Sequence, residues 1–208
     1  MATTTTNYGF DIPQSTDLVK DGATAIATLG QDIDTAMNTA LGTKKAGMVL
    51  LNTTSFSGVA SISLPANTFT STYTNYRIMF QNISPANSLA LSMRLRTSGS
   101  DNSTSNYDSA FLYAQSTTAY ASASDNASSF GLTASSGARI ISTIDLMNPQ
   151  TADDTLMVHS TYQTTSDSGT YNVGGGRFQL GTSFDSATFI ANSVNLLTGQ
   201  VQVYGYSK

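Results

Sequence analysis

The chain has 208 residues, a formal net charge of −4 at pH 7, one histidine and no cysteine, which excludes disulfides and thiolate chemistry. Charged residues make up only 11% of it and form no long basic run, so we expect no nucleic-acid partner. The amino terminus lacks the pattern of a signal peptide, and no apolar stretch approaches the roughly 18 residues that span a membrane, so we expect no membrane insertion.

Residues 1–14 show no helical period, and we predict an extended arm that docks on another protein. The apolar residues Tyr8, Phe10 and Ile12 alternate with other residues, as in a strand with one apolar face. We expect these three side chains to make the docking contacts. A frayed terminal tail is the alternative interpretation.

Residues 15–47 contain the only helical period, and we predict a helix that serves oligomerisation or attachment. Val19, Ile26 and Ile33 recur every seven residues, and Leu29 occupies the second position of the same seam. We expect these four residues to make the oligomerisation contacts, because a single helix of this length is marginal in water. β-branched residues at one seam position favour two strands, while small seam residues allow other arrangements. Packing against the chain's own β domain is the alternative.

From residue 48 the apolar period changes to two, and we predict that residues 48–208 form an antiparallel β-sandwich of the jelly-roll type. The Ala/Ser/Thr-rich stretch Ala114–Ser129 is expected to be a long surface loop. The run Gly174–Gly176 predicts a bulge, with a close approach of neighbouring backbone as the alternative. The expected strands are Met48–Leu51, Phe56–Leu64, Tyr76–Ile83, Leu89–Thr97, Tyr107–Gln115, Arg139–Met147, Leu156–Thr164, Tyr171–Leu180, Thr188–Val194 and Gln200–Tyr206.

Groups suited to catalysis are sparse, and we expect no enzyme, no cofactor and no metal site. His159 is the single histidine and the chain has no cysteine, so the residues for a catalytic triad with Cys or for a His/Cys zinc site are missing. Every acidic residue is Asp. Asp153–Asp154 is expected in a solvated turn and not as a glycosidase pair. Calcium binding by Asp101, Asn102 and Asp108 is an open alternative, although their spacing matches no EF-hand loop.

Tyrosine is the residue type most suited to recognition in this chain. Tyr107, Tyr113 and Tyr120 flank the Ser-rich stretch, and Tyr combined with Ser, Asn and Gly is common at binding surfaces. Since aromatic rings also stack on sugars, these three are candidate glycan contacts. The alternative is that they cover the edges of the β core.

A resemblance to a known family is carried by residues 8–35, which read YGFDIPQSTDLVKDGATAIATLGQDIDT. This segment resembles the N-terminal segment of tail-fibre and related virion proteins of tailed bacteriophages, in which D-L-V-K-D-G-A-x-A-I-x-x-L-G-x-x-I-D-T precedes an all-β region. Residues 198–206, TGQVQVYGY, are similar to the terminal strand of virion jelly-roll domains. The resemblance implies a homotrimeric structural protein of the virion, attached to the tail by its N-terminal segment.

We therefore expect a short tail fibre or fibre-like adhesin, located in the virion tail and assembled in the cytoplasm of the bacterial host. Its expected partners are copies of itself, other tail proteins and host surface polysaccharide. A trimeric capsid decoration or cement protein is the first alternative. A non-catalytic carbohydrate-binding module is the second.

Overall fold

The computed structural model describes residues 3–6, 9–12, 19–41, 47–85, 90–133, 139–164, 169–191 and 197–206. The chain divides into two compact units, one up to Gly47 and one from Met48 to Tyr206. The second unit begins where the apolar period of the sequence changes from helical to alternating. Each unit is described by itself.

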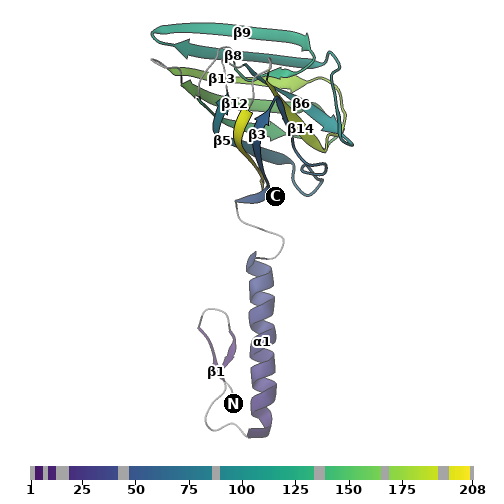
Figure 1. Ribbon diagram of the computed structural model, residues 1–208. Helices are drawn as coiled ribbons and strands as arrows, with labels where there is room; N and C mark the ends of the chain where they lie inside the picture. The colour runs from purple at the N-terminus through teal and green to yellow at the C-terminus, as the bar shows by residue number, and fades with distance from the viewer. Residues whose placement is uncertain are drawn as a thin grey trace. The chain divides into compact units, whose positions relative to one another are not determined.

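The first unit contains a short hairpin and one helix (Figure 1). β1 (Thr3–Thr4) pairs antiparallel with β2 (Asp11–Ile12). The backbone N–H of Thr5 donates to the carbonyl of Phe10 at 2.9 Å, and Gly9 has a positive φ of 68° that allows the chain to reverse. The described part of the expected extended arm is therefore a hairpin.

The helix α1 spans Val19–Leu41 and lies beside β2. Its sequence is rich in alanine and free of proline, which favours a helix, while Gly22 and Gly30 weaken it. Asp21 in the first turn is favourable because it faces the positive end of the helix dipole. The predicted helix is therefore present over its apolar repeat.

The larger sheet of the second unit has eight antiparallel strands among the described residues. Its spatial order is β3-β15-β5-β11-β12-β13-β8-β9, so β3 and β9 are its edges. The bounds are β3 Met48–Val59, β15 Leu197–Tyr206, β5 Asn75–Pro85, β11 Arg139–Met147, β12 Thr155–Thr164, β13 Gly169–Phe178, β8 Tyr107–Gln115 and β9 Thr118–Ala127.

The smaller sheet has the order β10-β6-β14-β4, and β7 pairs with β6. Its strands are short, which suits a cover over one part of the larger sheet. Their bounds are β10 Phe130–Gly131, β6 Leu91–Thr97, β14 Ser186–Ala191, β4 Ser61–Ser63 and β7 Ser100–Asp101.

Eight of the strands pair in a nested order along the chain. β3 pairs with β15, β4 with β14, β5 with β11, and β6 with β10, all antiparallel. Successive pairs belong alternately to the larger and the smaller sheet, so the eight strands form one long hairpin that is folded back to make both sheets. The strands β12, β13, β8 and β9 then extend the larger sheet beyond β11. The predicted mainly β architecture, with two antiparallel sheets, is confirmed.

The core lies between the two sheets, and two aromatic pairs cross it. Phe80 of β5 meets Phe189 of β14 at 4.5 Å between ring centroids, and Tyr107 of β8 meets Phe130 of β10 at 4.8 Å, both edge-on. Each pair joins one sheet to the other, and such pairs add about 0.5–1.5 kcal/mol beyond their burial. Further buried side chains include Ile62, Leu64, Phe69, Ile78, Leu91, Met93, Leu95, Ile140, Ile144, Leu146, Phe178, Val201 and Val203.

The stretch Ala114–Ser129 is not the predicted surface loop. It holds the end of β8, a turn at Ser116 with a positive φ of 54°, and the ten-residue strand β9, which pairs back onto β8. Nearly all of β9 is exposed on both faces. Only alanines alternate along it, at positions 119, 121 and 123, and no large apolar residues do, because neither face enters the core.

The run Gly174–Gly176 lies in β13 without a bulge, so that prediction is wrong. Its register with β12 and β8 is unbroken, with Gly174 opposite both His159 and Phe111. A Cβ atom on Gly174 would overlap Phe111, and one on Gly176 would lie 2.7 Å from the ring of Phe130. The Cβ atoms would also lie 2.5 Å from the carbonyl oxygen of Ala110 and 2.6 Å from that of Asp108, so the glycines allow the close approach of neighbouring backbone that is the alternative interpretation.

Candidate interaction surfaces

The apolar row of α1 is open to solvent in the single chain. Ile26 is 67% exposed and Ile33 is 40% exposed, whereas Leu29 is half-buried. Met37, which follows Ile33 by four residues, is also exposed. The side chain of Val19 lies outside the described residues. Three of the four predicted oligomerisation residues are thus described, and two of them offer exposed apolar surface.

The predicted docking residues belong to the hairpin. Phe10 is half-buried and Ile12 is 39% exposed, while Tyr8 lies outside the described residues. The backbone N–H of Phe10 donates to the hydroxyl of Thr5 at 2.9 Å, which ties this residue into the turn. Ile12 therefore offers more surface for contact than Phe10.

The three candidate glycan contacts separate into a core residue and an exposed pair. Tyr107 is fully buried; its hydroxyl accepts the N–H of Leu95 and donates to the carbonyl of Asn102. Burial raises the pKa of Tyr107 to about 12. Its prediction as a glycan contact is therefore wrong. Tyr113 and Tyr120 lie opposite each other on β8 and β9, with rings stacked at 5.0 Å and partly exposed.

His159 is a buried residue of the larger sheet. It is 4% exposed, and desolvation lowers its pKa to about 4, so the ring is neutral at physiological pH. Its Nδ1 lies 3.5 Å from the hydroxyl of Thr161, and its ring meets that of Phe111 edge-on at 6.0 Å. These contacts give His159 a structural place in the interior.

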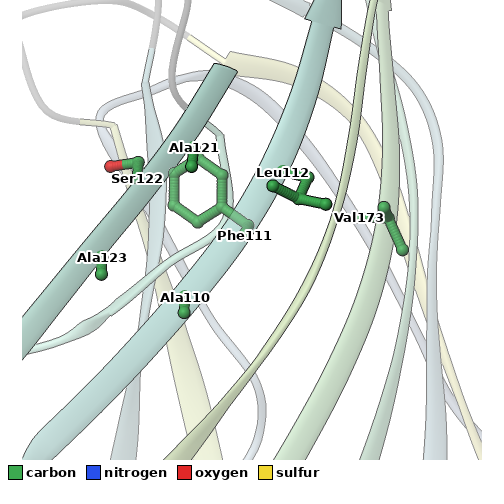
Figure 2. Close-up of a pocket in the computed structure, with 7 residues that line it drawn as sticks. All are labelled: Ala110, Phe111, Leu112, Ala121, Ser122, Ala123 and Val173. Carbon is green, nitrogen blue, oxygen red and sulfur yellow. The ribbon is translucent and has the colours of Figure 1, made fainter. Parts of the chain in front are cut away.

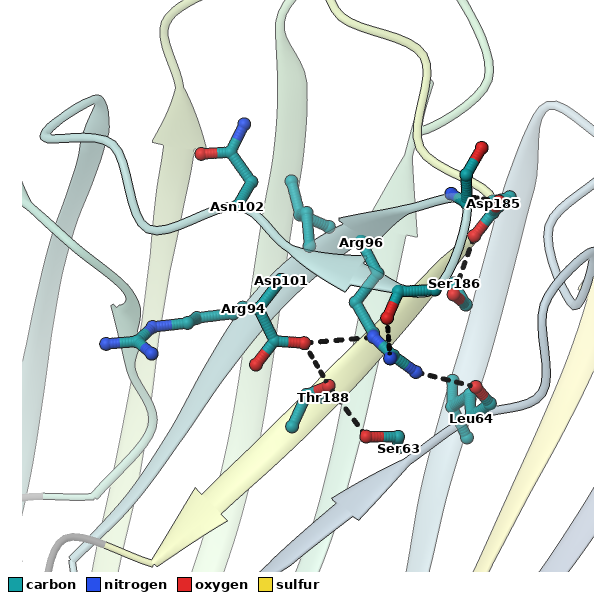
Figure 3. Close-up of polar contacts among 12 residues, drawn as sticks. Ser63, Leu64, Arg94, Arg96, Asp101, Asn102, Asp185, Ser186 and Thr188 are labelled. Carbon is teal, nitrogen blue, oxygen red and sulfur yellow. Dashed lines mark hydrogen bonds and ion pairs between the residues drawn. The ribbon is translucent and has the colours of Figure 1, made fainter.

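The two aspartates considered for calcium pair with arginine, and the side-chain oxygen of Asn102 accepts hydrogen bonds from Thr104. Figure 3 shows Asp101 between Arg96 and Thr188, with an Arg96 ion pair of 2.9 Å and a bond from the Thr188 hydroxyl of 2.7 Å. Asp108 accepts the backbone N–H of Asn126 and hydrogen bonds from Gln179 and Arg177. These bonds lower the pKa of Asp108, with the Asn126 N–H as the largest cause. Both carboxylates fasten loops and strand ends.

The larger sheet carries an exposed apolar surface on the side away from the smaller sheet. We call it the outer apolar face and define it by six large side chains of β8, β11, β12 and β13. They are between 44% and 61% exposed. The members are Leu112, Ile141, Val158, Tyr162, Tyr171 and Val173.

Two shallow hollows flank Val173 on this face. The first has a volume of ≈ 480 Å³ and lies mainly against small residues of β8 and β9, as Figure 2 shows. The second has a volume of ≈ 460 Å³ and reaches from Val173 to the Arg77–Asp145 ion pair. The first is lined by Ala110, Phe111, Leu112, Ala121, Ser122, Ala123 and Val173, and the second by Arg77, Thr143, Asp145, Val158, His159, Ser160, Val173 and Gly174.

Sequence reasoning did not find the outer apolar face, although a signal for it exists. In β12, Val158 and Tyr162 alternate with His159, Thr161 and Gln163. Alternation shows which residues share a face, and the apolar set is then expected inside. In this strand the polar set is buried and the apolar set is exposed. The reversal depends on the position of the second sheet, which the strand's own sequence does not contain.

Similarity does not assign this chain a function. In comparisons with known proteins, no family model, no curated protein and no solved structure matches it. In the described part of the chain, no helix is long and apolar enough to cross a membrane. The same residues contain no cluster of three or more His, Cys, Asp or Glu side chains that could hold a metal ion. A functional proposal must therefore rest on the two units and their exposed surfaces.

Proposed function

We propose that the chain is a structural protein of a tailed-phage virion, a short tail fibre or fibre-like adhesin. The observation that carries the proposal is the separation of a helix-bearing unit, which exposes Ile26 and Ile33, from a β domain with its own complete core. Because the core of the β domain is built from its own residues, a helix with exposed apolar side chains in the other unit is best explained as an assembly element. The resemblance of residues 17–35 to phage tail proteins supports the same role.

In this proposal α1 forms a homotrimeric bundle and the hairpin before it docks on a neighbouring tail protein. Formation of the bundle would remove the side chains of Ile26 and Ile33 from water, and burying each fully is worth about 1.5–3 kcal/mol. Leu29 would occupy the second seam position, as the heptad spacing predicts. Ile12 would contribute to docking, and three linked copies would multiply a weak contact of this kind.

We also propose that the β domain is a jelly roll. The support is the nested pairing of β3 with β15, β4 with β14, β5 with β11 and β6 with β10, which alternates between the two sheets. Two antiparallel sheets wound in this way are the arrangement of viral capsid and lectin jelly rolls. The strands β12, β13, β8 and β9 would then be additions to that plan.

The bundle is tested by the double variant Ile26→Asp and Ile33→Asp. Light scattering should show the mass falling below that of the trimer, while the circular dichroism of the β domain stays unchanged. Thr24→Asp with Gln31→Asp is the matched control, since these exposed residues have the same sevenfold spacing on the helix. An unchanged mass for the Ile26/Ile33 variant would exclude α1 as the bundle element.

Docking is tested by deleting residues 1–14. The truncated protein should remain a folded trimer and fail to join the virion. Normal incorporation of the truncated protein would remove the docking role. Electron microscopy of labelled particles then separates a tail location from a capsid location, which distinguishes the fibre from a decoration protein.

Contact with host polysaccharide is proposed at the Tyr113–Tyr120 pair. The stacked rings, on β8 and β9, are partly exposed, and ring faces of this kind stack on sugars. On a glycan array, Tyr120→Ala should abolish binding, and Tyr171→Ala, a similarly exposed tyrosine, should not. Equal glycan binding by the unchanged protein, Tyr120→Ala and Tyr171→Ala would reject this site.

A further inference from the structure

The outer apolar face extends over three consecutive cross-strand rows. Ile141, Tyr162 and Tyr171 lie side by side in one row, which continues to alanines of β8 and β9. Val173 and Leu112 are neighbours in the next row, and Val158 lies in the third. Alanines end all three rows on β8 and β9, at positions 110, 114, 119, 121 and 123. The first row is therefore apolar from β11 to the sheet edge, while the second begins with Thr143 and Ser160 and the third contains Asp145 and Gly175.

The face is large enough to matter for association. About half of each of six large side chains is exposed, which amounts to on the order of 500 Å² of apolar surface when each carries roughly 150–200 Å². The exposed alanines of β8 and β9 enlarge it. Stable interfaces bury about 800 Å² per partner. Single apolar residues scattered over a surface do not form a contiguous patch of several hundred Å². The six side chains thus supply roughly 60% of the area that one partner of a stable dimer buries, and the alanines add to it.

The strands that carry this face bury polar residues on their other side. Thr161 of β12 and Asn172 of β13 are fully buried, while Tyr162 and Tyr171, their next neighbours along the chain, are exposed. If the outer side of the sheet faced only water, the fold would be more stable with the apolar side chains turned to the interior and the polar ones outside, because removing apolar area from water is favourable. The observed orientation is favourable when another surface covers the outer side.

The face carries a projecting side chain next to a hollow. Leu112 is the most exposed of the six side chains, at 61%, and it stands beside the hollow that lies against Ala110, Ala121 and Ala123 (Figure 2). If two such faces met about a two-fold axis passing between Leu112 and the hollow, each leucine would lie over the hollow of the other copy, which is the reciprocal contact that a two-fold dimer requires. We propose that the outer apolar face binds the same face of a second copy of this chain, independently of α1.

The chemistry of the face favours a protein surface over a glycan. Leu112, Ile141, Val158 and Val173 have no group that hydrogen-bonds to a sugar hydroxyl. Within the three rows Asp145 is the charged residue, and Arg77 already binds it with two hydrogen bonds. A charge-poor core with tyrosines is typical of the centre of protein–protein interfaces.

The test uses the full chain in two backgrounds, unchanged and with Ile26→Asp and Ile33→Asp to remove the helix seam. Leu112→Asp with Val173→Asp disrupts the face, and Gln81→Asp with Gln202→Asp is the control on the polar half of the same sheet. Sedimentation should show that the helix variant still associates with concentration. The face substitutions should make that variant monomeric, and the control substitutions should not.

A second measurement reads the face directly and uses the absence of cysteine from the chain. A thiol reagent should modify Leu112→Cys about tenfold more slowly in concentrated than in dilute protein, because association covers the site, while Gln81→Cys reacts equally in both. A helix variant that stays monomeric up to about 1 mM would overturn the inference and leave the helix bundle standing. If Leu112→Asp with Val173→Asp made the protein monomeric in both backgrounds, the result would support association through the outer apolar face and reject the helix bundle.

Discussion

Arg77 of β5 donates two hydrogen bonds to the carboxylate of Asp145 on β11, at 2.8 and 2.7 Å. Tyr206 of β15 donates a third bond to the same carboxylate at 2.8 Å, and the Arg77 guanidinium lies 5.7 Å from its ring centre. The three strands are neighbours in the larger sheet. This cluster therefore links three neighbouring strands of the nested hairpin, β15, β5 and β11.

The first prediction concerns the pH dependence of this cluster. The bonds from Arg77 lower the pKa of Asp145, burial opposes them, and Tyr206 assists. A lowered folded-state pKa means that the carboxylate stabilises the fold above its unfolded pKa, near 4, and that this contribution is lost as the pH falls through the folded value. Because both side chains are partly exposed, Asp145→Asn should cost about 1 kcal/mol at pH 7.

Urea unfolding at pH 7 and at pH 3 measures this contribution. The difference between the unchanged protein and Asp145→Asn should shrink at the lower pH. Asp153→Asn, in a turn, is the control, and it should leave the stability at pH 7 nearly unchanged. Equal stability of Asp145→Asn and the unchanged protein at pH 7 would contradict the prediction.

The second prediction concerns His159, whose contribution to stability also falls as the pH falls, but in a higher pH range than that of Asp145. Burial lowers its pKa to about 4, against roughly 6.5 in the unfolded chain. Protons then bind the unfolded state more strongly between these values, so stability falls as the pH drops from about 6.5 toward 4. Lowering the pH from 7.5 to 5 should cost about 2 kcal/mol through this residue.

His159→Gln provides the comparison, because glutamine is polar and does not titrate. Guanidinium unfolding at pH 7.5 and pH 5 should show a smaller loss of stability for this variant than for the unchanged protein. Since the chain has a single histidine, the difference reports on His159 alone. Parallel pH profiles for the two proteins would show that the ring is not held neutral.

Sequence and structure agree best where one face of a strand enters the core. β11 matches its predicted bounds, since Ile140, Ile144 and Leu146 face the interior and leave a clear alternation. β9 lacks this signal because it is exposed on both faces. The partner of each strand is also hidden in the sequence, as the pairing of β3 with β15 joins the two ends of the domain.

The candidate site was predictable only in part for a related reason. Tyr107 and Tyr113 share one face of β8, so alternation treats them alike. Tyr107 is covered by Phe130 and Phe178, whereas Tyr113 remains partly exposed beside Tyr120. Which tyrosine is available for recognition depends on the covering residues, which come from other parts of the chain.

The third prediction follows from the buried hydroxyl of Tyr107. It accepts the N–H of Leu95 at 3.1 Å and donates to the carbonyl of Asn102 at 2.8 Å. Tyr107→Phe keeps the ring contacts and leaves the buried Leu95 N–H without this acceptor, which should cost about 1–3 kcal/mol. Thermal unfolding measures the loss. The exposed Tyr120→Phe is the control, and a similar small effect for both variants would speak against the role of the Tyr107 hydroxyl.

The last prediction concerns the space that Gly174 provides for Phe111. A Cβ atom at position 174 would overlap the Cα and Cβ atoms of Phe111 and lie 2.5 Å from the carbonyl oxygen of Ala110. Backbone atoms cannot move aside as the end of a flexible side chain can, so Gly174→Ala should destabilise the fold by about 2–3 kcal/mol. Gly131→Ala is the matched control, because its nearest atom, in the ring of Phe111, would be 3.4 Å away. Chemical denaturation of both variants measures their free energies of unfolding. Equal stability of Gly174→Ala and Gly131→Ala would mean that β8 and β13 can move apart without a loss of stability.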